Sequence, residues 1–463
     1  MTGQDRGAVG PAVTNVFDAR RYSVFECTSL DVNFESGAVE FGYALDGTGR
    51  LMFTERLLLP LPAGEIDAST RAGVLAVLQL THWVAGVSYF KAAAPDTVRI
   101  GDEPMTEAEL RYVAAIYRDG LAEFAYTNDL PSALRTAVVS SGVAADPVGI
   151  AVAGNGRPLV ACGGGKDSIV SLEALRSAGL DPVSFVVNPN AITRAVVERS
   201  DTPLLAVTRT IDPALFALNS TGAHNGHVPV TAINSLLAVA VSILHGLGPV
   251  VMSNESSASA PNLTWHQQPV NHQWSKGIDA ERLLRQALAS RLGPQERYFS
   301  LLRHLNELQI AGRFAALDGY DDVMTSCNRA FTITKNSGAR WCRNCPKCRF
   351  VFLALACFVP AERVVGILGG DLLRDCTQLE GYRELLGFGS PKPFECVGEL
   401  DESVAAIGHL GRLDAWQDAQ VVDALMKEIA ATARPVPTLA SVLAQRGPSL
   451  APTRFVATLD ATH

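Results

Sequence analysis

The sequence predicts an α/β protein built on a parallel sheet with helices on both faces. Three observations carry this prediction. Strand-length apolar runs alternate with helical segments over residues 157–320, residues 22–60 alternate apolar and polar positions between turn signals, and a glycine-rich turn follows the first strand of the alternating region. Strand–helix alternation is typical of parallel sheets covered on both sides. We expect an α+β amino-terminal domain over 1–150, the parallel-sheet domain over 151–320, and a cysteine-rich helical region over 321–463.

The amino-terminal elements are predicted first. The alternation over 22–60, with Asp46-Gly47 as a hairpin signal, predicts an antiparallel meander. A helix is expected over about 69–90, and a second one begins at Thr106, where Thr106 and Glu109 have the spacing of a capping box. A short strand and a turn are expected over Val148–Gly156.

The central elements follow in strict alternation. Short apolar runs predict strands, and the intervening segments have helical periodicity. The strands fall at 158–162, 183–189, 203–212 and 249–256, and the helices at 168–180, 193–200 and 230–248. Several further helices are expected beyond residue 320.

The composition fits a folded protein and disfavours several classes of partner. Of the 463 residues, 48% are apolar and 19% charged, which suffices for a large core. Lysine and arginine number 39 against 47 aspartate and glutamate, so the net charge is −8. This charge disfavours general binding to nucleic acid, although a local basic pocket is compatible with it. Only seven of the basic residues are lysine, so a lysine inside a motif stands out.

Export and membrane signals are not evident in the sequence. Met1–Gly10 is polar, which argues against a secretory signal. The longest apolar stretch, Leu236–Met252, is interrupted by His245 and Pro249, so it predicts a buried helix and a strand rather than a membrane span. Four of the nine cysteines crowd into residues 327–348, unlike the pattern of a secreted disulfide scaffold. We expect a cytoplasmic protein.

The most specific local motif is the glycine loop Cys162–Ser168, which reads CGGGKDS between a predicted strand and a predicted helix. Glycines let the backbone approach an anion, and a helix start offers unpaired N–H groups. Lys166 can neutralise phosphate charge, Asp167 can hold magnesium, and Ser168 can cap the helix and bond a phosphate oxygen. The loop matches neither G-x-G-x-x-G nor G-x-x-x-x-G-K-[ST]. A glycine-rich turn without a ligand is the structural alternative.

The loop resembles the pyrophosphate-loop motif S-G-G-x-D-S of the adenine-nucleotide alpha-hydrolases. The resemblance implies that ATP is cleaved between its α and β phosphates, that a substrate oxygen is adenylated and that pyrophosphate leaves. It also implies that the central sheet has the fold of that superfamily. Gly163 stands where the motif usually has serine, so the phosphate contact of that serine has no counterpart here.

Four cysteines form a second motif, C-x14-C-x2-C-x2-C. Two-residue spacings bring thiolates to one ion, and an all-thiolate tetrahedral site suits a closed structural zinc. An iron–sulfur cluster is the main competitor, and an unmetallated or disulfide-bonded set is the third option. The predicted ligands are Cys327, Cys342, Cys345 and Cys348.

Polar segments follow the predicted strands, at the end of the sheet where open parallel sheets bind ligands. Asn188, Ser253 and Asn254 are predicted nucleotide contacts. Glu255 is a candidate general base or magnesium ligand. The remaining candidates for proton exchange or anion binding are His227, His272 and Lys276. The structural alternative is that these residues satisfy turns and helix caps.

The order of the two motifs resembles that of 7-cyano-7-deazaguanine synthases, which are much shorter and lack the amino-terminal domain. The whole chain resembles the ATP-dependent UDP-N-acetylmuramoyl-L-alanyl-L-glutamate epimerases of bacterial peptidoglycan synthesis. That resemblance rests on residues 86–95, 162–168, 225–233, 253–259, 271–276 and 327–348. It implies conversion of the terminal L-glutamate of UDP-MurNAc-L-Ala-L-Glu to D-glutamate, with ATP going to AMP and pyrophosphate.

The resemblance also implies roles for the candidate residues. Pyrophosphate would be cradled by Gly163, Gly164, Gly165 and Ser168. Lys166 would steady the phosphates, and Asp167 with Glu255 would hold magnesium. Proton transfer would fall to members of the set His227, Glu255, His272 and Lys276. The implied cofactors are ATP, Mg²⁺ and structural Zn²⁺.

The implied partners are the UDP-linked dipeptide and, functionally, an L-glutamate-adding muramoyl ligase. The amino-terminal domain is a candidate grip for the UDP-sugar. Two alternatives stay open at this stage. One is another pyrophosphate-loop adenylating enzyme that acts on a nucleobase or on tRNA, which the acidic net charge disfavours. The other is a non-enzymatic ATP-binding regulator, against which the intact Lys166-Asp167-Ser168 argues.

Overall fold

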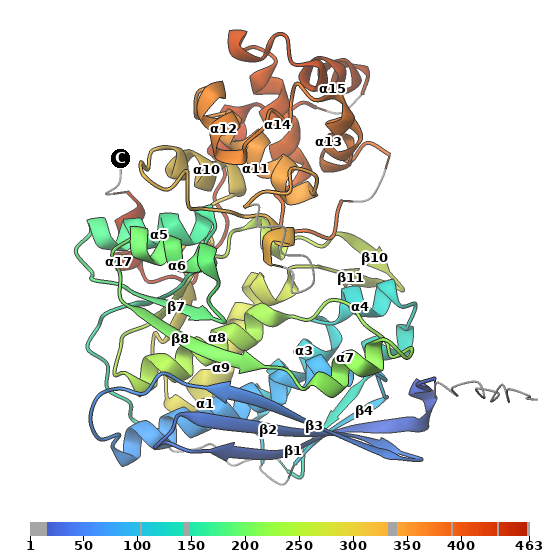
Figure 1. The fold of residues 1–463 in the computed structure, drawn as a ribbon, viewed down its shortest axis with the longest axis vertical. Helices are drawn as coiled ribbons and strands as arrows, with labels where there is room; N and C mark the ends of the chain where they lie inside the picture. The colour runs from blue at the N-terminus through green and yellow to red at the C-terminus, as the bar shows by residue number, and fades with distance from the viewer. Residues whose placement is uncertain are drawn as a thin grey trace, which may run out of the picture.

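The structure of the protein is a computed structural model that describes residues 16–101, 104–142, 149–331, 340–389, 392–432 and 435–460 (Figure 1). Within these ranges, ten strands form one mixed sheet in the order β12-β9-β6-β7-β8-β3-β2-β1-β4-β5. The polar segment Met1–Gly10 and Val148 lie outside the described residues. The sheet strands are β1 Tyr22–Val32, β2 Ala38–Gly47, β3 Arg50–Leu58, β4 Thr97–Ile100, β5 Ala137–Val139, β6 Leu159–Ala161, β7 Val183–Val187, β8 Leu204–Thr210, β9 Val250–Met252 and β12 Tyr298–Ser300.

The amino-terminal strands form the predicted antiparallel meander. β1 pairs with β2 and β2 with β3, and β3 then pairs antiparallel with β8 through Arg56 and Thr210. Residues on both sides of position 150 therefore contribute to one continuous sheet. The predicted capping box is present at the start of α3 (Glu107–Arg118), where Thr106 and Glu109 each bond the other's backbone N–H.

The central strands confirm the predicted parallel arrangement. β8, β7, β6, β9 and β12 run parallel, and the side chains of β6 alternate between two cores. Leu159 joins the core with α1 (Ala68–Ala85), α8 (Val230–Leu244) and α9 (Ile278–Leu292). Val160 joins the core that contains α5 (Lys166–Ser177) and α6 (Ala191–Arg199) on the opposite face (Figure 1). The helices thus cover both faces.

One strand expectation is wrong. Residues 149–156 form no strand. Ile150 N–H donates to Arg291 O and Asn155 N–H to Gly246 O, both at 2.9 Å. Single bonds to the last turn of α9 and to the turn after α8 give no ladder, so the segment is an irregular connection. Conversely, β4, β5 and β12 have only four, three and three residues, too short to give a periodic signal.

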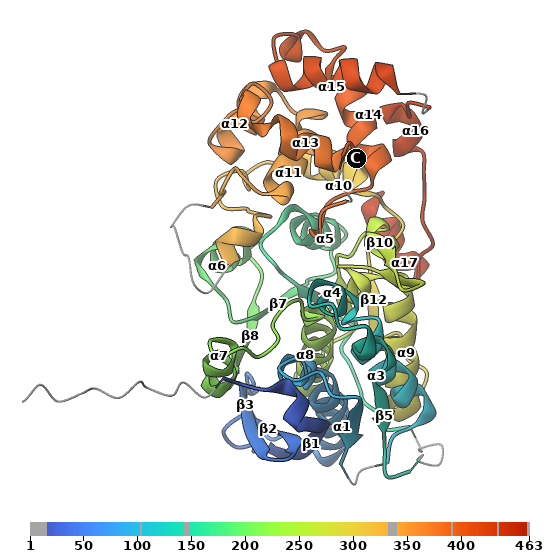
Figure 2. The ribbon, with the colours of Figure 1, turned by 90° about the vertical axis from the view of Figure 1, so that its right-hand side faces the viewer.

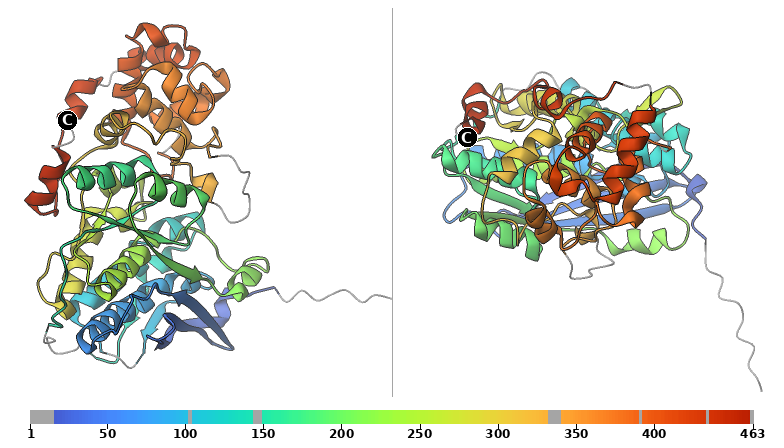
Figure 3. Two further views of the ribbon diagram at one scale, coloured as in Figure 1. Left: turned by 60° about the vertical axis from the view of Figure 1, so that its left-hand side comes forward. Right: turned by 90° about the horizontal axis from the view of Figure 1, so that it is seen from above.

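The carboxyl-terminal helices form one end of the molecule, and the meander forms the other (Figure 2). A final segment returns from this end to lie beside α5 (Figure 3). These elements are α10 Glu307–Ala315, α11 Pro346–Ala356, α12 Ala361–Leu368, α13 Leu379–Leu385, α14 Leu400–Leu410, α15 Gln420–Ala431, α16 Leu439–Leu443 and α17 Thr453–Val456. The smaller elements are α2 Val87–Phe90, α4 Ala122–Thr127, α7 Pro213–Asn219, and the hairpin β10 Leu263–Trp265 with β11 Gln268–Val270.

One helical segment has the length and apolar character of a membrane span. It is Ala68–Phe90, formed by α1 and α2, and 83% of its most apolar window is buried by the rest of the chain. α1 packs against α8, so this segment occupies the position of a core helix. The stretch Leu236–Met252 divides, as predicted, into the end of α8 and the short strand β9.

Candidate functional site

A cavity of about 380 Å³ opens at the carboxyl ends of β6, β7 and β9. We call it the central cavity. It lies where the strand order changes direction, since the chain runs from β6 to β7 and β8 on one side and later to β9 and β12 on the other. Loops diverge at such a point, which makes it the usual ligand crevice of an open parallel sheet. Its lining includes these predicted site residues: Gly163, Gly165, Asp167, Ser168, Asn188, Ser253, Asn254 and Lys276.

Two positions of the glycine loop favour glycine, one through its backbone conformation and one through a close neighbour. Gly164 has a φ of +80°, in the left-handed region. At Gly165 an added Cβ would come within 2.8 Å of Ser326 Oγ. The N-cap of α5 is Gly165 and not the expected Ser168, whose Oγ donates to Gly165 O at 3.0 Å. The first turn of α5 therefore presents its N–H groups without a side-chain cap, as an anion-binding helix start does.

Lys166 is fully buried behind this loop and contacts the carboxylates of Asp167 and Glu307. Lys347 Nζ lies 3.4 Å from Glu307 Oε1. Burial alone would lower the pKa of Lys166, but Asp167 and Glu307 raise it above its usual value. Burial alone would raise the pKa of Glu307, but Lys166 and Lys347 bring it down to about 2. The cluster therefore holds permanent charges beside the cavity.

A second group of titratable side chains surrounds Lys276. Lys276 Nζ lies 3.1 Å from Cys396 Sγ, and both residues line the cavity. His272 Nδ1 lies 2.5 Å from Glu123 Oε2, and His227 Nδ1 lies 3.5 Å from the same oxygen. The two predicted histidines are thus neighbours, with ring centroids 4.6 Å apart.

The two histidines differ in charge. Burial and the neighbouring His272 lower the pKa of His227 to about 4, so it is neutral at pH 7. For His272, burial opposes the charged form, but hydrogen bonds to Cys396 and Glu123 raise the pKa to about 9. His272 is therefore an imidazolium at pH 7, next to a thiol and a carboxylate.

Glu255 is buried, and Arg303 donates to its backbone oxygen at 2.8 Å. Burial and the nearby Glu307 raise the pKa of the Glu255 carboxyl, while Lys276 counteracts them. Asn188 uses both polar atoms of its side chain on the backbone of Arg209, each at 2.8 Å, so it fixes the β7–β8 edge of the cavity. Ser253 Oγ donates to Ser171 Oγ at 2.8 Å.

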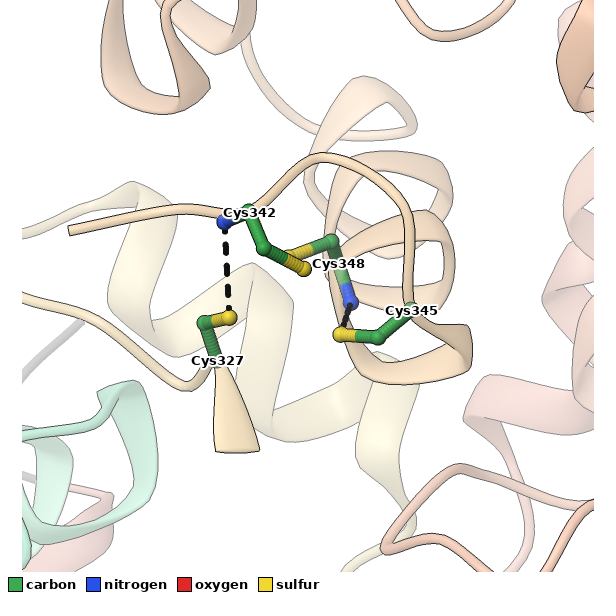
Figure 4. A group of neighbouring side chains, drawn as sticks. All are labelled: Cys327, Cys342, Cys345 and Cys348. Atoms are coloured by element: carbon green, nitrogen blue, oxygen red, sulfur yellow. Dashed lines mark hydrogen bonds between the residues drawn. The ribbon is translucent and has the colours of Figure 1, made fainter. Parts of the chain in front are cut away.

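The four motif cysteines converge as expected from their spacing (Figure 4). Their sulfur atoms all lie within 4.8 Å of one another. Cys342 Sγ and Cys348 Sγ are 3.8 Å apart, far longer than the disulfide bond length of about 2.05 Å. Four convergent thiols fit a tetrahedral metal centre, and the donor set suits either zinc or an iron–sulfur cluster.

The cysteine segment also forms part of the central cavity. Thr325 N–H donates to Gly164 O at 3.0 Å, which ties the approach to Cys327 to the glycine loop. Lys347, between Cys345 and Cys348, reaches Glu307 and lines the cavity. The segment that carries the cysteine cluster and the glycine loop therefore contact each other and form adjoining walls of the central cavity.

Four residues of this site were not predicted from the sequence: Glu307, Lys347, Cys396 and Glu123. Lys347 had a usable signal, because it is one of seven lysines and lies inside the cysteine motif. The other three lie in α10, in the loop before α14 and in α4, and nothing in their local sequence sets them apart. Lys91, in a segment quoted for the family resemblance, donates to Asn225 Oδ1 at 2.5 Å and so links two such segments.

Comparison with known proteins gives consistent matches over most of the chain. Residues 16–301 match the MurL N-terminal domain model, and residues 323–439 match the MurL C-terminal domain model. A Salinispora tropica protein named UDP-N-acetyl-alpha-D-muramoyl-L-alanyl-L-glutamate epimerase is 54% identical over 438 residues, which cover 94% of this chain and 95% of the relative. Proteins of the same name from a Micromonospora strain and from Xanthomonas oryzae pv. oryzae are 53% and 41% identical, over 95% and 90% of this chain and 98% and 92% of theirs. No solved structure matches the chain.

Proposed function

The chain belongs to the MurL family, and from that premise we propose that it catalyses the ATP-dependent epimerisation of the terminal L-glutamate of UDP-MurNAc-L-Ala-L-Glu. It is an enzyme of the isomerase class, as its relatives' names state for them. The proposed products are the D-glutamate epimer, AMP and pyrophosphate, and the proposed intermediate is an acyl-adenylate. None of these three relatives is named for a nucleobase, for tRNA or for regulation.

Adenylation makes the epimerisation chemically accessible. Removing the α-proton of a free carboxylate would place two negative charges side by side. Transfer of AMP to the carboxylate removes one of these charges, and the acyl oxygen can then accept the electron pair, where a nearby cation stabilises it. Each unit by which the pKa of the carbon acid falls is worth about 1.4 kcal/mol. A loop that cleaves a nucleotide therefore has a clear purpose in an epimerase.

The residues around the central cavity suit this chemistry. The glycine loop and the first turn of α5 offer backbone N–H groups to phosphate oxygens. Lys166 and Lys347 provide fixed positive charge against the phosphates, and Glu307 holds both ammonium groups in place. Asp167, which lines the cavity, would provide a carboxylate ligand for Mg²⁺, with Glu255 as the second candidate.

One observation carries the proposal. In a chain whose relatives are named epimerases, an anion-binding loop and a set of acid–base side chains converge on the same cavity, so activation of a carboxylate and exchange of its α-proton would share one site. A plain nucleotide-binding protein has no need of the second set. This convergence also favours the interpretation that the central strands have the fold of the pyrophosphate-loop superfamily.

We assign the four cysteines a structural zinc. All four protein positions are thiols, which leaves no open coordination site for a substrate or a water, so the ion would stabilise the fold of the cavity wall. Such a thiolate site and the other free cysteines suit a reducing compartment, which supports a cytoplasmic location. There an L-glutamate-adding muramoyl ligase would supply the substrate.

The test is an incubation in deuterated water with ATP, Mg²⁺ and UDP-MurNAc-L-Ala-L-Glu. We expect AMP and pyrophosphate, one deuterium on the glutamate, and D-glutamate after hydrolysis. UDP-MurNAc-L-Ala, which lacks the glutamate, is the control substrate and should give neither AMP nor deuterium uptake. If UDP-MurNAc-L-Ala-L-Glu gave neither AMP nor deuterium uptake, the proposed function would be refuted.

A further inference from the structure

Cys396 is the thiol that the carboxyl-terminal part of the chain brings into the central cavity. It lies in the loop between α13 and α14, more than two hundred residues after the glycine loop, yet both line the same space. Lys276 Nζ is 3.1 Å from its sulfur. Cys396 is therefore positioned next to an ammonium group and open to whatever occupies the cavity.

An imidazole and a carboxylate stand behind this thiol. His272 lies close enough to Cys396 for each side chain to shift the pKa of the other, and its Nδ1 lies 2.5 Å from a carboxylate oxygen of Glu123. A carboxylate that orients an imidazole, which in turn contacts a thiol, is the arrangement that generates reactive thiolates in proteins. The three residues come from α4, the loop after β11 and the loop before α14, so only the fold brings them together.

The charges around Cys396 favour its thiolate. Burial alone would raise the pKa of the thiol, but Lys276 and the hydrogen bond from His272 lower it to about 7, with a smaller contribution from Lys347. These three are the cations that face the sulfur. At neutral pH a substantial fraction of Cys396 is therefore ionised, and a base with a pKa near the working pH is the most effective proton carrier.

A buried amide in the same cavity indicates that the space is built for a ligand. Asn254 is only 6% exposed, and its Nδ2 group has no hydrogen-bond partner among the described residues. Its side chain lines the cavity that Cys396 also lines. A buried donor without a partner costs about 1–3 kcal/mol, so it marks a place where a bound molecule supplies the acceptor.

We propose that Cys396 is a catalytic residue that exchanges the α-proton of the activated glutamate, and that Lys276, His272 and Glu123 are positioning residues that hold it as a thiolate. This inference rests on the proposed function. In the step, the Cα–H bond breaks, an S–H bond forms on Cys396, and the electron pair of the C–H bond moves into the activated acyl group. The D configuration forms when a proton from solvent reaches the opposite face of the planar carbon, and the Cys396 thiol then returns its proton to solvent.

Cys396 fits this role better than His227, His272 and Lys276, three of the residues that the sequence suggested. His227 and His272 both lie beside Glu123, and neither histidine is among the residues that line the central cavity. Lys276 carries a full charge at neutral pH, because the nearby thiolate and Glu255 outweigh the effect of burial and raise its pKa. A protonated lysine cannot abstract a proton, so it stabilises the thiolate and the developing enolate.

The decisive experiment separates adenylation from proton exchange in the full-length protein. Wild type, Cys396→Ser and Cys396→Ala are incubated with ATP, Mg²⁺ and the UDP-linked dipeptide, once with hydroxylamine to trap the acyl-adenylate and once in deuterated water. We expect both variants to release pyrophosphate and form hydroxamate within about three-fold of wild type. We expect deuterium uptake to fall by a factor of about 10² to 10⁴, the usual contribution of a general base. Cys376→Ser, at an exposed cysteine, is the matched control and should leave both readouts unchanged.

The other outcomes are equally informative. Deuterium uptake at the wild-type rate in Cys396→Ser would overturn the assignment, and so would a substrate-derived acyl group found by mass spectrometry on Cys396, since the thiol would then act as a nucleophile. If wild type itself gives no pyrophosphate, the proposed function fails before Cys396 is tested. The positioning role of His272 has its own readout, which is the pH midpoint of iodoacetamide alkylation of Cys396. This midpoint should rise in His272→Gln, and an unchanged midpoint would show that His272 does not stabilise the thiolate.

Discussion

Replacing Glu307 with glutamine should destabilise the protein through the two lysines that remain. Glu307 is fully buried and neutralises Lys166 and Lys347, so the variant leaves two ammonium groups near the cavity with Asp167 as the nearest carboxylate. Its pKa lies at about 2 in the fold, against a usual value of 4.5. At about 1.4 kcal/mol per pKa unit, that depression corresponds to roughly 3 kcal/mol, within the range of about 3–5 kcal/mol for breaking a buried pair.

The assay is thermal unfolding followed by circular dichroism at pH 7. An unfolding entropy of about 2 cal/mol/K per residue over 463 residues converts 3 kcal/mol into a fall in Tm of about 3 °C or slightly more. Because the folded pKa is depressed, the stabilisation is present above pH 4.5 and is lost as the pH falls toward 2. The difference between wild type and variant should therefore be constant from pH 7 to 5 and shrink in acid.

The matched control is Glu402→Gln. Glu402 is also buried, but burial raises its pKa to about 7, and its carboxylate accepts from the backbone N–H groups of Leu308 and Glu399. An amide oxygen can replace one of these bonds, so the loss should be about 1 kcal/mol. The reasoning about the buried charges would be refuted if the Tm of Glu307→Gln at pH 7 lay within 1 °C of the wild-type Tm. It would also be refuted if Glu307→Gln lowered the Tm by no more than Glu402→Gln does.

Three further predictions concern the metal, the glycine loop and the pH dependence. Cys345→Ser should lose the bound metal, measured by elemental analysis, and most of its soluble yield, whereas a soluble and fully active metal-free variant would remove the structural-metal assignment. Gly165→Ala should slow pyrophosphate release at least about ten-fold, since its Cβ would press on Ser326, while Gly366→Ala in α12, whose Cβ meets nothing within 4 Å among the described residues, should match wild type; equal rates in the two variants would contradict the loop geometry. The kcat/KM for deuterium uptake should rise through a pKa of about 7 as Cys396 ionises and fall above about 9 as His272 loses its proton, and a flat profile from pH 6 to 10 would contradict both assignments.

The elements that the sequence could predict are those with a local cause. The capping box at Thr106, the alternation of the meander and the strand–helix alternation of the central sheet all depend on neighbours in the chain, and the structure confirms them. The pairing of β3 with β8 could not be predicted, because it joins residues about 150 positions apart through backbone bonds that any side chain permits. For the same reason the division of the chain at residue 150 stays a prediction.

The candidate site divides along the same line. The glycine loop and the cysteine motif can be recognised from residue spacing, since a tight turn and a tetrahedral metal site both impose fixed intervals on the chain. Glu307 and Cys396 carry no such interval, because they meet Lys166 and Lys276 only after the carboxyl-terminal helices have packed against the sheet. Single buried charges and thiols become recognisable only by their partners, and those partners are distant in sequence.

The position of Lys347 gives a reason why a closed metal site would lie so close to the glycine loop. Cys345 caps the start of α11 and Cys348 lies in its first turn, so the sulfur cluster fixes the first turn of this helix and with it Lys347 between them. The ammonium group then has to reach Glu307, which also holds Lys166 at the start of α5. The hydrogen bond from Thr325 to Gly164, two residues before Cys327, adds a second link on the other side of the loop. A metal held by these thiols would thus fix how Lys166, Lys347 and the backbone of the glycine loop are placed around a bound phosphate group. The metal itself would not touch the substrate. On this argument, metal loss should impair phosphate binding through geometry before it exposes any catalytic group.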